Sequence, residues 1–308
     1  MAVKINIYTN PAGLKHDTGP GHPESPARLE AVLSLFGQAP FDVVPLLKCR
    51  EMELSPLLYA HSRNYIDSIA EMTPDEGYRY LDADVIMSPD TWEAAVTAAN
   101  TLCRAVDDVM AGDCDRAFCA VRPPGHHAMP DQAMGFCFFG NVFIGARHAQ
   151  EKYGIKRIAI IDFDVHHGNG TDAMTRGAEG IFFISSHQSP FYPGTGDPRD
   201  DQTGKILNIP LGAGAGSKEF RSVYEAQVFP ALEEFRPELM MISAGFDAHH
   251  DDPLASLNLD EHDYLWVTEK LAALAEKYCG GRIISTLEGG YDLKALQASV
   301  AAHLQGLM

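Results

Sequence analysis

The chain has 308 residues, of which 45% are hydrophobic and 21% are charged, as in an ordinary globular protein. This composition excludes a disordered chain, a collagen-like repeat and a coiled-coil rod. The formal net charge of −18 at pH 7 argues against direct nucleic-acid binding, which needs a basic surface.

Apolar segments with the length of strands alternate with amphipathic segments along the whole chain. The predicted order is strand 5–9, helix 27–35, a helix between 88 and 112, strand 116–121, helix 142–152, strands 157–162, 180–185 and 205–209, helix 219–235, strand 238–243, helix 261–278, strand 282–287 and helix 293–304. The central strands are nearly continuous apolar runs, which is typical of a parallel sheet covered on both faces. We therefore expect one α/β domain over residues 1–308.

The longest predicted helix has recognisable ends. Ser88 is a suitable N-cap, Pro89 suits the first helical position, and Gly112 suits the exit. Apolar residues recur between them at three- and four-residue steps, namely Trp92, Val96, Ala99, Cys103, Val106 and Met110. This pattern predicts a helix with one buried face.

Six of the thirteen histidines form doublets, and each doublet lies just beyond a predicted strand. The doublets are His126-His127, His166-His167 and His249-His250, and the Gly-Gly-Tyr291 turn follows a fourth strand. Open α/β sheets bind ligands at the carboxyl ends of their strands. The four strand ends therefore predict a single active site.

Asp162, Asp164 and His166 are spaced two residues apart and share one face of an extended strand. A carboxylate and an imidazole at this spacing can bind one metal ion, and Asp252 is the best candidate for a third ligand. Three protein ligands leave a position for water, and this donor set suits zinc, iron(II) or manganese. The alternative is that these residues are strand-end caps and packed histidines.

The His126-His127 doublet follows a stiff Pro-Pro-Gly turn, and histidine is the usual general acid or base near neutral pH. Asp162 and Asn169 are placed to accept their ring N–H groups. Tyr291 follows two glycines, which let a phenol approach a ligand and stabilise an oxyanion. The alternatives are a structural histidine pair and a surface tyrosine. A phosphate loop is disfavoured by the acidic context and because no lysine directly follows the glycines.

The chain resembles the zinc-dependent histone deacetylase family, in its class II and bacterial amidohydrolase-like branch. The resemblance covers about residues 20–293 in the family's order. The matching strings are His22-Pro-Glu, Arg122-Pro-Pro-Gly-His-His, Met134-Gly-Phe-Cys, Asp162-x-Asp-x-His-His-Gly-Asn-Gly, Ser243-Ala-Gly-Phe-Asp with Asp252-Pro, and Leu287-Glu-Gly-Gly-Tyr.

The resemblance implies an arginase-like three-layer α/β/α fold and assigns roles to individual residues. It makes Asp164, His166 and Asp252 the ligands of one zinc ion. It makes His127 the general base and acid, His126 chiefly electrostatic, and Tyr291 the oxyanion stabiliser. Asp162 would pair with His126, and Asn169 would pair with His127 where many relatives carry Asp.

The resemblance also implies an acyl-lysine tunnel and a structural potassium site. Phe136 and Tyr192 would form the tunnel walls, with Gly135, Gly290 and Leu254 at its border. Some polyamine-specific relatives carry Glu at the position of Leu254, so this residue favours acyl-lysine as the substrate. The potassium ligands would be Asp162 and Ser185 with the backbone carbonyls of Asp164, His166 and Ser186.

The implied activity is deacylation of Nε-acyl-lysine, such as acetyl-lysine, in proteins or peptides by metal-activated water. An acetylpolyamine or other small-amide deacetylase stays open, as do a binuclear manganese ureohydrolase and an inactive acyl-amine-binding protein. Iron(II) is the alternative metal in the cell, and a homo-oligomer is compatible with the sequence.

Three features of the sequence bear on where the protein acts. The six cysteines form no C-x-x-C pair, which indicates reduced, buried thiols. No signal peptide or membrane span is evident, so we expect a cytoplasmic protein without membrane contact.

Overall fold

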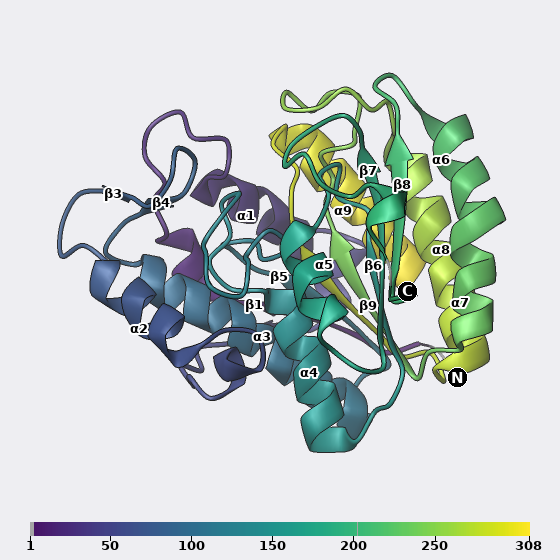
Figure 1. The fold of residues 1–308 in the computed structure, drawn as a ribbon, viewed down its shortest axis with the longest axis horizontal. Coiled ribbons are helices and arrows are strands. Elements are labelled where there is room, and N and C mark those ends of the chain that lie inside the picture. The colour runs from purple at the N-terminus through teal and green to yellow at the C-terminus, as the bar shows by residue number, and fades with distance from the viewer. Residues whose placement is uncertain (1–2, 202) are drawn as a thin grey trace.

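The computed structural model describes residues 3–201 and 203–308, which contain an eight-stranded sheet in which every paired neighbour is parallel (Figure 1). The strand order is β2-β1-β5-β10-β9-β6-β7-β8. The strands are β1 (Ile5–Thr9), β2 (Leu46–Lys48), β5 (Arg116–Ala120), β6 (Ile158–Asp162), β7 (Ile181–Gln188), β8 (Ile206–Leu211), β9 (Leu239–Ala244) and β10 (Ile283–Leu287). The four strands that precede the predicted active-site motifs are β5, β10, β9 and β6, and they are consecutive at the centre of the sheet.

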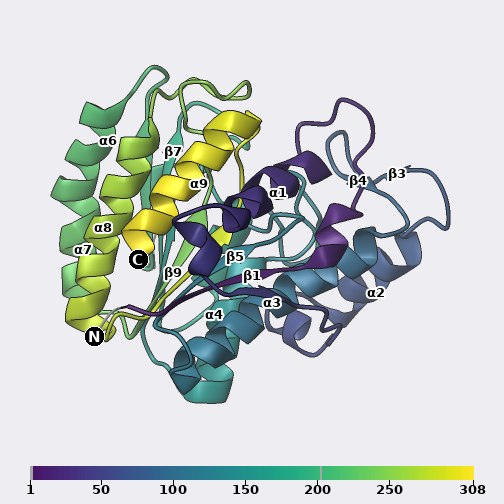
Figure 2. The same cartoon turned by 180° about the vertical axis from the view of Figure 1, so that it is seen from behind.

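Helices cover both faces of the sheet. The described α-helices are α1 (Pro26–Leu33), α2 (Arg63–Met72), α3 (Thr91–Ala111), α4 (Asn141–Tyr153), α5 (Asn169–Arg176), α6 (Ser217–Val223), α7 (Phe229–Phe235), α8 (Glu261–Tyr278) and α9 (Leu293–Leu307). Figure 1 shows α4 and α5 in front of the sheet, and Figure 2 shows α1 and α9 over its other face. Within the described ranges, no helix combines the length and the apolar character that a membrane crossing requires.

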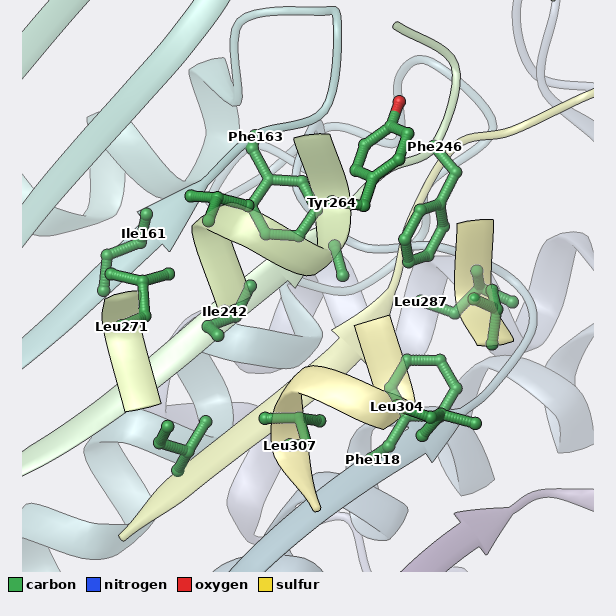
Figure 3. Packing of buried hydrophobic residues seen from close by; sticks show 14 of the residues in the cluster. Phe118, Ile161, Phe163, Ile242, Phe246, Tyr264, Leu271, Leu287, Leu304 and Leu307 are labelled. Atoms are coloured by element: carbon green, nitrogen blue, oxygen red, sulfur yellow. The ribbon is translucent and has the colours of Figure 1, made fainter. Parts of the chain in front are cut away.

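The central strands are apolar on both sides because each side faces a different core. In β5, Phe118 belongs to the cluster beneath α1, α8 and α9, whereas Ala117 and Cys119 belong to the cluster beneath α3 and α4. The same alternation holds for β6, where Ile160 and Ile161 belong to opposite clusters. Figure 3 shows the first of these cores, with side chains of β5, β6, β9, α8 and α9 packed together. The predicted three-layer α/β/α architecture is confirmed.

A smaller part of the chain projects beyond the edge of the sheet and carries a third core. It comprises α2 and the short antiparallel pair β3 (Arg79–Tyr80) and β4 (Ile86–Met87), which lie far from α6–α8 in Figure 1. Ile66 and Ile69 of α2 pack there against Val96 and Ala99 of α3. We call the segment from β3 to β4 the arm.

Most predicted elements agree with the structure to within about two residues, and the differences have local causes. The predicted 219–235 helix begins earlier, at Ser217, and contains a π-helical turn at Tyr224–Val228 between α6 and α7. The proposed cap at Ser88 is wrong, because the N-cap is Asp90 and the Ser88 hydroxyl accepts from the Asp17 amide. The exit at Gly112 is correct, since this residue has φ +81°. Sequence reasoning missed α2, α5, β2 and the arm because these elements are short or begin with poor helix formers.

Candidate active site

Four adjacent strand ends bring the predicted site residues together. Since β5, β10, β9 and β6 run parallel, their carboxyl ends lie at one edge of the sheet. Asp162 ends β6 and pairs in register with Ser243 of β9 on one side and Ser185 of β7 on the other. All three side chains are fully buried. The sheet register therefore places the polar groups of distant motifs next to one another.

A group of potential metal ligands lies just beyond these strand ends. Ligand atoms of Asp164, His166 and Asp247 all lie within 4.8 Å of one another. The His166 Nδ1 is 3.0 Å from Asp164 Oδ1 and 3.1 Å from Asp247 Oδ2. Burial lowers the pKa of His166, but these two carboxylates outweigh it and raise the pKa to about 10. The arrangement concentrates negative charge around one imidazole nitrogen.

Asp252, the third ligand expected from the sequence, lies at the border of this group. Its Oδ2 accepts from the backbone N–H of Tyr291 at 2.7 Å, and its Oδ1 accepts from that of Leu254 at 3.0 Å. Burial raises the pKa of Asp252. Burial and the charge of Asp164, with a smaller contribution from Asp252, raise the pKa of Asp247. The two carboxylates therefore share one electrostatic environment, and sequence reasoning underestimated the proximity of Asp247 to His166.

Two glycines let the backbone approach these carboxylates. A Cβ at Gly245 would overlap Asp164, and one at Gly289 would overlap both Asp164 and Asp247. The Gly289 N–H donates instead to Asp164 Oδ2 at 2.8 Å. The Gly-Phe-Asp and Glu-Gly-Gly-Tyr turns therefore require glycine for close packing around the carboxylates.

His126 is held as the more basic member of its doublet. Its Nδ1 donates to Asp162 Oδ2 at 3.0 Å, and its Nε2 lies 3.8 Å from Asp164 Oδ1. Burial lowers its pKa, but the charges of Asp164 and Asp162 outweigh burial and raise the pKa well above 6.5. His126 therefore favours the positively charged form.

His127 is held in the opposite state. Its Nδ1 donates to Asn169 Oδ1 at 2.7 Å, which leaves Nε2 without a proton in the neutral ring. Burial and the neighbouring charges of His126 and His166 lower its pKa well below 6.5. The pairing of each histidine with its expected partner thus gives one charged and one neutral imidazole side by side, with ring centroids 4.0 Å apart.

Glu288 supports the doublet, and the sequence reasoning assigned it no role. Its Oε2 accepts from the backbone N–H groups of Gly125 at 2.7 Å and His126 at 3.2 Å. Its Oε1 accepts from the Ser243 hydroxyl at 3.3 Å. Burial raises the pKa of Glu288 to about 7. The signal available in the sequence was a glutamate at the end of an apolar strand, directly before the two glycines.

Tyr291 packs against a buried arginine. The Arg28 Nε donates to the Gly290 carbonyl at 2.6 Å, and its guanidinium carbon lies 4.9 Å from the centre of the Tyr291 ring. Burial raises the pKa of Tyr291 well above 10, so the phenol keeps its proton and can donate a hydrogen bond. Gly290, expected at the border of the tunnel, contributes its carbonyl to this support.

These groups surround a cavity of about 210 Å³, which we call the acyl pocket. Its lining residues are Asp84, His127, Gly135, Phe136, His166, Phe191, Tyr192, Leu254 and Tyr291. Phe136, Tyr192, Gly135 and Leu254 were expected there, whereas Phe191 and Asp84 were missed. The Phe191 ring stacks on His166 with centroids 5.2 Å apart and an interplanar angle of 18°. A Cβ at Gly135, which has φ +54°, would overlap the His127 ring, so glycine is required beside this histidine.

Two other predicted features lie outside the acyl pocket. Ser185, expected at a potassium site, is buried beside Asp162, and its hydroxyl lies 3.0 Å from His187 Nδ1. His249 and His250 stack on each other with centroids 4.3 Å apart, and neither lines the acyl pocket. The His249 Nδ1 accepts from the Asp251 N–H, so the proton of the neutral ring is on the buried Nε2. This doublet thus differs from His126-His127.

Comparisons with known proteins identify the family of the chain. The family model of the histone deacetylase domain matches residues 22–307. The chain is 37% identical over 98% of its length to Histone deacetylase 14, chloroplastic, from Arabidopsis thaliana, covering 76% of that protein. It is also 37% identical to a histone deacetylase-like amidohydrolase from Pseudomonas aeruginosa, over 88% of this chain and 73% of the relative.

The same relation is visible in the fold. The crystal structure of the HDA15 HD domain matches with a TM-score of 0.92 and 32% identity, covering 99% of this chain and 90% of that one. A probable deacetylase from Archaeoglobus fulgidus is 37% identical over 91% of this chain and 79% of its own length. With its arginase-like α/β/α fold and a family match along nearly its whole length, the chain belongs to the histone deacetylase family.

Proposed function

We propose that this chain is a metal-dependent hydrolase that removes the acyl group from Nε-acyl-lysine in proteins or peptides. One observation carries the proposal: a neutral imidazole with an available Nε2 and a protonated phenol face the same small pocket beside clustered carboxylates. A water-activating base and an oxyanion donor are the two groups that amide hydrolysis requires. The names of the deacetylase and amidohydrolase relatives support the same chemistry.

The donor set fits one zinc ion held by Asp164, His166 and Asp252, with Asp247 beside it. Burial raises the pKa of Asp247 and of Asp252, and the charges of Asp164 and Asp252 raise that of Asp247 further, so a bound cation would stabilise the ionised carboxylates. Carboxylate with imidazole suits zinc or iron(II). When bound, such an ion would polarise the amide carbonyl and increase the acidity of water. A potassium ion near Asp162 and Ser185 belongs to the same proposal.

Side chains of the protein transfer the protons and stabilise the oxyanion. Nε2 of His127 accepts a proton from the attacking water while Asn169 holds the opposite nitrogen. The Tyr291 hydroxyl donates to the carbonyl oxygen as negative charge develops there. The protonated histidine then returns the proton to the departing lysine amine. The products are a carboxylate, such as acetate, and a polypeptide in which the lysine side chain carries a free amine.

The residues that line the acyl pocket favour a narrow, apolar substrate chain. Its walls include Phe136, Phe191 and Tyr192, which suit the methylene chain of lysine. Leu254 at the lining offers no charge for the second amine of a polyamine. These features favour acyl-lysine over an acetylpolyamine, which is the alternative substrate.

The test is acetate release from an acetyl-lysine peptide by the protein carrying one equivalent of zinc. We expect turnover that a chelator abolishes and zinc restores. Tyr291→Phe should lower kcat by about 10²–10³-fold because one oxyanion donor is lost, while the zinc content stays unchanged. Metal analysis that finds two manganese ions per chain, or an unaffected Tyr291→Phe variant, would contradict the proposal.

An acetylated polyamine assayed in parallel distinguishes the substrates. Preferential turnover of the polyamine would keep the mechanism and reject the role given to Leu254.

A further inference from the structure

A second cavity lies beside the acyl pocket and belongs to none of the groups described above. It has a volume of about 440 Å³ and lies between α2, the arm and residues 131–133. We call it the side pocket. Buried Tyr65, Ile69 and Ala133 contribute to its lining, and Arg79 and Asp131 add opposite charges. A cavity of this size with an apolar base and few charges is suited to one organic group.

The arm and residues 133–135 separate the two cavities. Leu81 lines the side pocket and Asp84 lines the acyl pocket, so the arm separates them by at most about 11 Å of chain. Ala133 and Gly135 are related in the same way across at most about 7 Å. An extended peptide advances about 3.3 Å per residue, so two to four residues cover this span.

The surface around both cavities carries exposed aromatic rings. Tyr78 and Tyr80 of the arm region are 43% and 66% exposed, and Tyr192 at the acyl pocket is 38% exposed. They are the aromatic members of the exposed large hydrophobic residues among the described parts of the chain. Exposed tyrosines are enriched where proteins bind other polypeptides.

We propose that the side pocket binds a large apolar or aromatic side chain of the substrate polypeptide, two to four residues from the acyl-lysine. This inference rests on the proposed deacylase function and adds to it that the substrate is a polypeptide. A polyamine has no side chain that could fill the side pocket. The contact requires a chain that crosses the arm or residues 133–135 while its acyl-lysine occupies the acyl pocket.

The experiment compares the turnover of two kinds of substrate: acetyl-lysine peptides, and an isolated acetyl-lysine with both termini capped. Nine-residue glycine peptides carry a central acetyl-lysine and one phenylalanine, placed in turn two, three or four residues before or after it. At one of these positions, phenylalanine should raise kcat/KM about tenfold over glycine, chiefly through KM, because an aromatic ring becomes buried. The capped acetyl-lysine measures the acyl pocket alone.

Two variants of the side pocket test whether this gain arises there. Tyr80→Ala removes an exposed wall, and Ser68→Trp fills the cavity. Both should abolish the gain from phenylalanine and leave turnover of capped acetyl-lysine unchanged. Leu58→Ala is the matched control, because Leu58 is 43% exposed and does not line the side pocket.

The outcomes separate this inference from the proposed function. If no position of phenylalanine raises kcat/KM, or if the gain survives both variants, the side pocket does not bind substrate. If the zinc-loaded protein hydrolyses neither the capped lysine nor any peptide, the deacylase proposal fails and this inference fails with it.

Discussion

The floor of the acyl pocket is formed by polar side chains that follow the ends of β5, β6 and β10, whereas its walls are aromatic side chains in the loops that follow β5 and β7. The floor comprises His127, His166 and Tyr291, and the walls comprise Phe136, Phe191 and Tyr192. Floor groups are fixed by buried contacts such as His127 to Asn169 and Gly289 to Asp164. Short, buried strand ends limit movement of the reacting groups.

The walls are held by hydrogen bonds from outside the sheet. The His61 Nδ1 donates to the Pro130 carbonyl at 3.1 Å, and its Nε2 accepts from the Gly140 N–H at 2.9 Å, so it joins both ends of the Phe136 loop. The other wall loop is attached by His167, whose Nδ1 lies 2.8 Å from the Thr195 hydroxyl. The difference indicates that floor residues control turnover, whereas wall residues control substrate affinity.

The largest effect is expected at the floor. His127→Ala removes the general base and should lower kcat by about 10²–10⁴-fold with a small change in KM. Steady-state kinetics on an acetyl-lysine peptide measures this, with zinc content and thermal unfolding as controls for integrity. If His127→Ala raised KM but kept kcat, the assignment of turnover to the floor residues would be wrong.

Lowering the pH should reduce the stability of the fold through protonation of His61, which holds one of the wall loops. Burial lowers its folded-state pKa to about 4, so the unfolded chain binds more protons between pH 6.5 and 4. The stability associated with neutral His61 is complete above pH 6.5 and falls by roughly 3 kcal/mol as the pH drops to 4. Buried His16 and His187, also with pKa values of about 4, add to the same slope.

Denaturant unfolding at several pH values measures this loss. His61→Gln should make the dependence on pH shallower, because glutamine does not titrate. His262→Gln is the control, since the His262 side chain is 82% exposed. If the free energy of unfolding depended equally on pH in the wild type and in His61→Gln, His61 would not be a source of the pH dependence.

A pair of changes at Glu288 examines how the floor is supported. Glu288→Ala leaves the N–H groups of Gly125 and His126 without their acceptor, which should cost about 1–3 kcal/mol and lower kcat. Glu288→Gln keeps an amide oxygen for these groups and should restore most of the stability. If alanine and glutamine were equivalent in unfolding and turnover, the hydrogen bonds would not be what positions the doublet.

The smallest effect is expected from Tyr192→Phe in the wall. This change keeps the ring, whose centroid is 5.2 Å from that of His127, and removes the hydroxyl of a residue that is 38% exposed. We expect kcat to be unchanged and KM to change by less than about threefold, within the usual range for surface substitutions. A large fall in kcat would instead place the Tyr192 hydroxyl among the floor groups.

The sequence by itself determined the strands of the sheet and the polar motifs that follow their ends. Continuous apolar runs predicted strands buried on both faces, and the spacing of Asp162, Asp164 and His166 identified a turn rich in potential ligands. The family match and the three-layer fold confirmed the resemblance carried by these motifs. Such features are local, so neighbouring residues are enough to reveal them.

Only the tertiary structure decided which distant groups meet. The approach of Asp247 to His166, the support of His126 by Glu288 and the stacking of Phe191 on His166 depend on packing between separate loops. The arm and the side pocket likewise arise where α2 packs against α3 and residues 131–133. Contacts between segments far apart in the chain depend on sheet order and burial, which no local pattern encodes.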